Sequence, residues 1–154
     1  RRAPHASPGN PVAWDGSVEL NEALLRWLGL GEAALVEQVE ATRVKVQRRA
    51  EALRRGRGPL DLAGRELVLV DDGLASGFTM RLAVQASRAH DPGRVGVAAP
   101  TAPAATVAEL AELADVVWCA NVRAGMPFAV ADAYRNWRDV TEAEAAALLA
   151  ARGR

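Results

Sequence analysis

Hydrophobic positions in the first third of the chain follow helical spacing. From Glu32 onward, apolar or small residues recur every three or four positions, which predicts one long amphipathic helix over Glu32–Arg55. Its stripe consists of Leu35, Val39, Thr42, Val46, Ala50 and Leu53. A shorter helix is expected over Glu22–Leu28, where Asn21 is suited to the N-cap and Gly29 to the stop.

After residue 58, short apolar runs alternate with helical stretches. Glu66–Val70 predicts a strand covered on both faces, and Arg94–Ala99 and Val116–Cys119 predict two more strands. Helices are expected between them, from Thr79 to about His90 and over Thr106–Ala114. Because parallel strands need long crossover connections, this alternation predicts an α/β fold with a mainly parallel sheet and flanking helices.

The length of the chain is that of a single compact domain. Its 154 residues amount to 16.3 kDa, which falls within the usual range for one hydrophobic core. We therefore expect one domain over 1–154, composed of an irregular, mobile loop (1–16), a helical segment (17–58), a βαβαβ core (59–120) and a C-terminal segment (121–154). In that last segment, Thr141 followed by Glu144 is typical of a capping box that opens a terminal helix.

Charge and composition narrow the classes of partner. Nineteen Lys and Arg balance nineteen Asp and Glu, so no global field attracts nucleic acid or an anionic membrane. No apolar stretch approaches the roughly 20 residues of a membrane span, and no signal peptide is recognisable, so a cytoplasmic location is expected. The single cysteine, Cys119, excludes an internal disulfide, and its apolar surroundings predict a buried thiol. Trp27 and Trp118 are predicted to belong to the core.

The segment 68–80 places polar chemistry where a strand ends. Two adjacent carboxylates, Asp71 and Asp72, are followed by a short loop with two glycines and two hydroxyls, and then by a helix. Open α/β sheets bind ligands at the carboxyl ends of their strands. The N–H groups of the loop and of the helix N-terminus favour a phosphate, to which Ser76 and Thr79 can add hydroxyl donors. The carboxylates can accept hydrogen bonds from a sugar diol.

A purely structural interpretation of the same residues stays open. Asp71 and Asp72 suit a turn, and Thr79 suits a helix cap. Against this, two adjacent carboxylates after a buried strand repel each other and lose hydration. A diol and a divalent cation at the site would offset that cost, so the residues favour a site for phosphate and diol over the turn.

The segment also resembles the phosphoribosyl pyrophosphate motif of type I phosphoribosyltransferases, and it does so across its whole length. The matching residues are Asp71, Asp72, Gly73, Leu74, Ala75, Ser76, Gly77, Phe78 and Thr79. From Pro8-Gly9-Asn10-Pro11 to the C-terminus, the chain is similar to a bacterial subgroup of that family. The similarity includes an Ala-Pro-rich segment at 98–103 and a Phe-Ala-Val segment at 128–130.

The resemblance implies a Rossmann-like core and a role for each matched residue. Asp71 and Asp72 would bind the 2- and 3-hydroxyls of the ribose and act in catalysis. The segment 75–79 would hold the 5-phosphate, and Gly73 and Leu74 complete the substrate-binding set. Mg²⁺ would be held mainly by substrate oxygens, with the two carboxylates helping directly or through water. The implied reaction displaces pyrophosphate from the anomeric carbon by a nitrogen nucleophile, usually that of a nucleobase.

The sequence departs from the family pattern at its N-terminal side. Relatives carry a further strand that ends in a pyrophosphate-binding loop, similar to Pro-Arg-Gly-Gly, which this sequence does not contain. The mobile loop of the family would correspond to Arg1–Pro11, and the stretch between Pro11 and Ser17 is shorter than in relatives. We therefore expect an incomplete sheet. A ribose-phosphate-binding or regulatory module without transfer, or a truncated inactive relative, stays open beside the enzyme, as does a remnant that binds only inorganic phosphate or sulfate.

Further expectations concern partners, aromatic residues and histidines. The exposed helix Glu32–Arg55 is suited to pairing in a homodimer. The aromatic segment from Phe128 to Trp137 is suited either to packing or to stacking on an acceptor base. Neither His5 nor His90 has the spacing of a metal site, and the resemblance implies small-molecule partners rather than nucleic acid or membrane.

Overall fold

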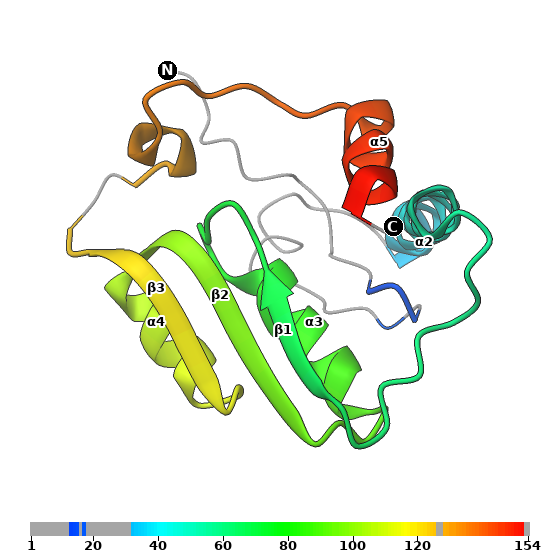
Figure 1. The fold of residues 1–154 in the computed structure, drawn as a ribbon, viewed down its shortest axis with the longest axis horizontal. Coiled ribbons are helices and arrows are strands. Elements are labelled where there is room, and N and C mark those ends of the chain that lie inside the picture. The colour runs from blue at the N-terminus through cyan, green and yellow to red at the C-terminus, as the bar shows by residue number, and fades with distance from the viewer. Residues whose placement is uncertain (1–12, 16, 18–31, 126–127, 153–154) are drawn as a thin grey trace.

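Three parallel strands joined by two helices form the centre of the structure (Figure 1). The computed structural model describes residues 13–15, 17, 32–125 and 128–152. The expected helix Glu22–Leu28, most of the N-terminal loop and Trp27 lie outside these residues. The described elements are α2 (Glu32–Arg54), β1 (Glu66–Val70), α3 (Phe78–Arg88), β2 (Arg94–Pro103), α4 (Ala104–Ala111), β3 (Val116–Arg123), the 3₁₀ turn η1 (Val130–Ala133) and α5 (Glu142–Arg152).

The strands lie in the order β1-β2-β3, and both pairings are parallel. Leu67 lies opposite Val95, and Val97 lies opposite Val117. Each pair of neighbouring strands is joined by a helix, α3 or α4. The predicted α/β class with a mainly parallel sheet and flanking helices is confirmed.

The hydrophobic core lies between the sheet and these two helices, which cover the same face of the sheet (Figure 1). Val95 and Val97 of β2 and Leu110 of α4 are fully buried there. Cys119 is only partly buried, although it packs against this core. The predicted buried thiol is therefore found at the margin of the core.

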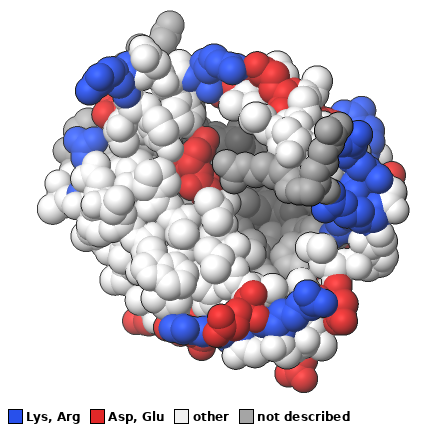
Figure 2. Space-filling model, viewed as in Figure 1, with Lys and Arg blue, Asp and Glu red and all other residues white. Residues whose placement is uncertain are grey.

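The opposite face of the sheet is open, which corrects two predictions. Val68 and Val70 are 54% and 74% exposed, so β1 is covered on one face only. Trp118 is 50% exposed rather than buried. Its ring lies across Gly96, where an added β-carbon would come within 2.6 Å of it. Figure 2 shows few charged side chains over the middle of this side of the molecule.

The order of the strands explains why one face stays open. Right-handed crossovers that step in the same direction across a sheet place their helices on the same side. The steps from β1 to β2 and from β2 to β3 both run in one direction. Helices α3 and α4 therefore cover one face together.

Strands β2 and β3 run four residues beyond the predicted ends, to Pro103 and Arg123. Their pairing continues through Thr101 opposite Asn121 and Ala102 opposite Val122. The extension of β2 begins at Pro100 and ends at Pro103. Proline lacks the N–H that a strand donates to its neighbour, so these residues argue against a strand when the sequence is considered alone. The helices differ less from prediction: α3 begins one residue earlier and ends at Arg88, and α4 is shifted toward its N-terminal side.

Helices α2 and α5 pack against each other beside the sheet (Figure 1). Val39, Val46 and Leu53 of the predicted stripe are partly buried, as are Arg43 and Arg54 beside it. Arg49 of α2 pairs with Glu142 of α5, with 3.6 Å between Nε and Oε2. Among the described residues, no helix is both long enough and apolar enough to cross a membrane.

Candidate functional site

Asp71 and Asp72 follow β1 at the carboxyl edge of the sheet. The N–H of Asp71 donates to the carbonyl of Ala98 at 3.2 Å, so the parallel ladder extends to this residue. Its half-buried carboxylate accepts a hydrogen bond from the N–H of Asp72 at 2.9 Å, whereas the side chain of Asp72 is exposed. Burial raises the pKa of Asp71, and the neighbouring charge of Asp72 adds to the rise, against the lowering effect of that hydrogen bond.

The N-terminus of α3, which follows these carboxylates after a short loop, presents main-chain donors. Gly77 is its N-cap, with a φ of 74° and no capping side chain. The first helical bond runs from the N–H of Arg81 to the carbonyl of Gly77 at 2.8 Å. Within the described part of the chain, the N–H groups of Ser76 through Met80 donate to no protein acceptor. Thr79 is exposed and does not cap the helix, contrary to the structural interpretation of this motif.

The loop between the carboxylates and the helix is held in place by hydrogen bonds to β2 and α4. Leu74 is 2% exposed and donates its N–H to the carbonyl of Thr101 at 3.0 Å. Thr106 donates its hydroxyl to the carbonyl of Ala75 at 3.0 Å. Its methyl group would lie 2.7 Å from a β-carbon added at Gly77. Only glycine therefore fits at this left-handed position.

The segment after β3 returns to the same loop, a contact that the sequence did not predict. Tyr134 donates its hydroxyl to the carbonyl of Asp72. Val130 of η1 lies so close to Gly73 that an added β-carbon would overlap its side chain. Tyr134 and Trp137 pack at 5.0 Å between ring centroids. The only signal in the sequence is that an aromatic segment follows the third strand.

The described residues contain no group of three or more His, Cys, Asp or Glu that could hold a metal ion. Asp71 and Asp72 by themselves supply too few ligands for Mg²⁺, which prefers six oxygens. A magnesium ion here would need ligand oxygens from a substrate. His90 lies 3.8 Å from a carboxylate oxygen of Asp15 and stacks on Trp14, which gives both ring systems a packing role.

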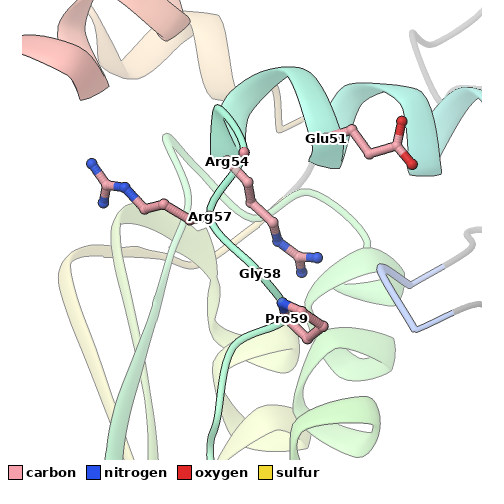
Figure 3. A pocket seen from close by; sticks show the side chains of 6 residues that line it. Glu51, Arg54, Arg57, Gly58 and Pro59 are labelled. Carbon is pink, nitrogen blue, oxygen red and sulfur yellow. The ribbon is translucent and has the colours of Figure 1, made fainter.

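A partly open hollow of about 230 Å³ lies elsewhere, after the end of α2 (Figure 3). It is lined by Glu51, Arg54, Gly56, Arg57, Gly58 and Pro59. None of these residues belongs to the segment 71–79. Arginines at the C-terminal end of a helix are favoured by the helix dipole, so we assign the hollow no ligand.

Comparison with known proteins finds relatives of this chain both in sequence and in fold. "Putative phosphoribosyl transferase Rv0571c" of Mycobacterium tuberculosis is 40% identical over 138 residues, which cover 90% of this chain and 31% of that protein. The corresponding protein of a second strain matches to the same extent. Among solved structures, TT1426 from Thermus thermophilus has a TM-score of 0.70 and 30% identity, over 94% of this chain and 72% of that one.

The chain thus spans less than a third of the length of the Mycobacterium proteins that it matches. The family model described as "Phosphoribosyl transferase domain" matches residues 15–133. This match includes the whole sheet, both crossover helices and the segment 71–79. Together with the similarity in sequence and fold, it shows that the chain belongs to the phosphoribosyl transferase family.

Proposed function

We propose that this domain binds 5-phosphoribosyl 1-pyrophosphate with Mg²⁺ and transfers the phosphoribosyl group to a nitrogen acceptor, a nucleobase. One observation carries the proposal. The acid pair that follows β1 is joined by a short loop to the N-terminus of α3, and the N–H groups of residues 76–80 have no acceptor among the described residues. A ligand that joins a phosphate to a diol matches both parts.

Each part of the segment has a distinct task in this proposal. The N–H groups of residues 76–80 and the hydroxyls of Ser76 and Thr79 bind the 5-phosphate. Asp71 and Asp72 accept hydrogen bonds from the 2- and 3-hydroxyls of the ribose. When the bond to pyrophosphate breaks and the acceptor nitrogen attacks, positive charge develops at the anomeric carbon. The nearby carboxylates stabilise that charge.

The metal and the acceptor complete the reaction. Mg²⁺ would neutralise the leaving pyrophosphate, with Asp71 and Asp72 contributing directly or through water to an ion held mainly by substrate oxygens. Trp137, which is 42% exposed, offers an aromatic surface next to Tyr134. Such a surface supports a planar acceptor, because aromatic rings stack on nucleobases.

Calorimetric titration with 5-phosphoribosyl 1-pyrophosphate and Mg²⁺ tests the site. The double variant Asp71→Asn with Asp72→Asn is expected to bind at least about tenfold more weakly, because charged hydrogen bonds to the diol are lost. Asp91→Asn is the matched control. Asp91 is an acid just before β2, at the amino edge of the sheet, and its removal should leave the affinity unchanged. Equal affinity in the double variant and the wild type would refute the assignment of the site.

Transfer is tested separately, by the release of pyrophosphate from 5-phosphoribosyl 1-pyrophosphate in the presence of the protein and Mg²⁺. Purines, pyrimidines and other nitrogen compounds serve as acceptors. Release that depends on one acceptor and on both acids supports the enzyme. Tight binding without release for any acceptor would contradict transfer and favour a binding module.

A further inference from the structure

We propose that Tyr134 is a positioning residue for the diol-binding acids, acting through the peptide that joins Asp72 to Gly73. The proposal rests on the function proposed above, because it assumes that Asp71 and Asp72 bind the sugar. It adds a residue outside the motif, 62 positions further along the chain than Asp72.

The peptide in question lies between two points that the sheet holds. On one side, the N–H of Asp71 is bonded to Ala98, and on the other, the N–H of Leu74 is bonded to Thr101. Neither of these hydrogen bonds involves the carbonyl of Asp72 or the N–H of Gly73, which form the peptide between them. Among the described residues, its one hydrogen bond is the one that the hydroxyl of Tyr134 donates to the carbonyl of Asp72.

The exposed acid depends on the main chain of Asp72 for its position. The side chain of Asp72 makes no ion pair with a described residue. Its carboxylate is therefore placed by the main chain of Asp72, which is held on one side by the hydrogen bond from its N–H to Asp71 and on the other by the bond from Tyr134 to its carbonyl. By holding the carbonyl of Asp72, Tyr134 keeps the two acids aligned for neighbouring hydroxyls.

Tyr134 is itself held in place, as a positioning residue must be. Its ring packs on Trp137 with 5.0 Å between centroids. Its N–H donates to the carbonyl of Ala131 at 3.1 Å, at the end of η1. Val130, from the same turn, packs against Gly73. The hydroxyl thus approaches the loop from a segment that touches that loop at two adjacent residues.

Tyr134→Phe removes the hydroxyl and keeps the ring, so it isolates the hydrogen bond. The measurement compares calorimetric affinities for ribose 5-phosphate and for inorganic phosphate, both with Mg²⁺. Ribose 5-phosphate needs the acids and the phosphate-binding amides, whereas phosphate needs the amides alone. We expect Tyr134→Phe to bind ribose 5-phosphate about fivefold more weakly, which corresponds to the net free energy of one ordinary hydrogen bond. Its affinity for phosphate should be unchanged.

A double-mutant cycle with Asp72→Ala shows whether Tyr134 acts through Asp72. In the Asp72→Ala background, Tyr134→Phe is expected to have no further effect on ribose 5-phosphate. An unchanged affinity of Tyr134→Phe for ribose 5-phosphate would overturn the inference. So would an equal loss for both ligands, or a penalty that persists without Asp72.

The same data separate this inference from the function on which it rests. If Asp72→Ala weakens ribose 5-phosphate and Tyr134→Phe does not, only the positioning role fails. If Asp72→Ala has no effect either, the assignment of the acids to the sugar fails with it. Melting temperatures of the same samples show whether each variant is folded at the temperature of titration.

Discussion

Asp71 occupies a position where an ionised carboxylate costs folding free energy. It is half-buried and lies next to a second acid, and both conditions raise its pKa. Asparagine could accept the same hydrogen bond from the N–H of Asp72 without carrying a charge. A charge kept at such a position is typical of a binding or catalytic site, because a ligand can offset its cost.

Asp71→Asn is therefore expected to stabilise the ligand-free protein at pH 7 while it weakens ligand binding. The folded state holds the proton of Asp71 more tightly than the unfolded state, whose pKa is near the ordinary value of 3.8. The stability of the wild type consequently falls as the pH rises from about 3.8 through the raised pKa. The stability of the variant does not fall over this pH range, because asparagine does not titrate. Urea unfolding at pH 3 and pH 7 should show its advantage at pH 7 only, and a wild type that is more stable than the variant at pH 7 would contradict this account.

Gly73 is expected to tolerate no side chain. A β-carbon there would overlap Val130 and lie 3.1 Å from a methyl group of Thr101. We predict that Gly73→Ala lowers the free energy of unfolding by about 1–3 kcal/mol, as overpacking generally does. Adding Val130→Ala should recover part of the loss, which chemical denaturation of the single and double variants measures. No recovery would show that Val130 is not the obstacle.

For individual residues, the sequence predicted the segment 71–79 better than the residues that contact it. The acid pair and the glycine loop lie next to each other in the chain, so their spacing alone placed them after β1. Tyr134, Val130 and Trp14 gave no comparable signal, because their partners lie far away in the sequence. Trp118 was predicted in the core because its neighbours are apolar, but its side chain points to the open face.

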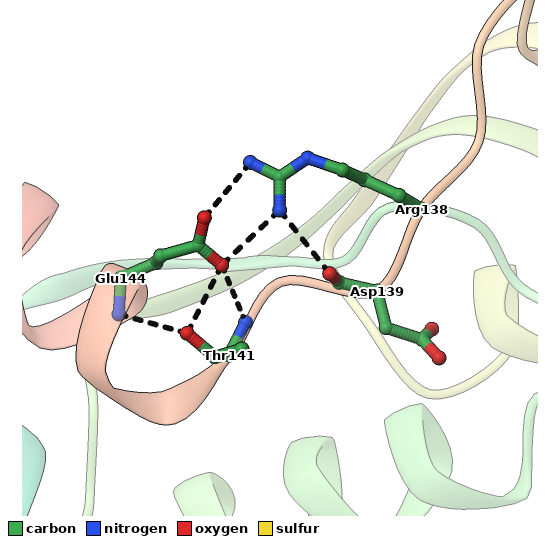
Figure 4. Close-up of polar contacts among 4 residues, drawn as sticks. All are labelled: Arg138, Asp139, Thr141 and Glu144. Atoms are coloured by element: carbon green, nitrogen blue, oxygen red, sulfur yellow. Dashed lines mark hydrogen bonds and ion pairs between the residues drawn. The ribbon is translucent and has the colours of Figure 1, made fainter.

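Helix α5 shows how completely a local pattern can determine an element boundary (Figure 4). The N–H and the hydroxyl of Thr141 donate to Oε2 of Glu144 at 2.9 and 3.0 Å. The N–H of Glu144 donates in return to the hydroxyl of Thr141 at 3.2 Å. The predicted capping box is confirmed, and Arg138 adds an ion pair at 3.0 Å. The pairing with Arg138 and the hydrogen bonds from Thr141 lower the pKa of Glu144 to about 2.

Glu144→Gln is expected to remove an acid-sensitive contribution to the start of α5. Because the folded pKa of about 2 lies below the ordinary value of 4.5, this contribution is present above pH 4.5 and is lost as the pH falls toward 2. Amide hydrogen exchange at residues 142–146 should be faster in the variant at pH 6, and the difference should shrink below pH 4. Thr141→Ser, which keeps the hydroxyl, is the matched control. A difference independent of pH would contradict the assignment to the charge of Glu144.

Other boundaries needed information that no local pattern holds. The strand β1 was predicted with its observed ends, because an apolar run between polar residues defines it. The extensions of β2 and β3 to Pro103 and Arg123 depend on pairing between the two strands. Proline in such a segment is a poor local signal, although its neighbours Thr101 and Ala102 pair with β3 and are buried.

In the whole molecule, one face of the sheet carries the core and the other carries exposed apolar side chains. The alternation of strands and helices was enough to predict the α/β class. It was not enough to predict which faces are covered, because this depends on the direction of each crossover. The division of apolar residues between a buried and an open face has a measurable consequence for stability.

Leu110→Ala and Trp118→Ala should therefore differ in cost despite the larger size of tryptophan. Leu110 is fully buried in the core, and its truncation is expected to cost about 2–5 kcal/mol. Trp118 is half-exposed, so its removal should cost clearly less than that of Leu110. Urea unfolding of both variants under the same conditions tests this. A Trp118 variant as unstable as the Leu110 variant would show that the open face is covered in solution.

The bond between Tyr134 and Asp72 also bears on how the protein is made. Synthesis proceeds from the N-terminus, so a nascent chain contains the whole 71–79 segment well before Tyr134 leaves the ribosome. Until then the acids and the amides are present, but the carbonyl of Asp72 lacks its partner. On the proposed function, full affinity for the sugar would consequently arise late, after the strands have formed and the segment that carries Tyr134 has reached the loop.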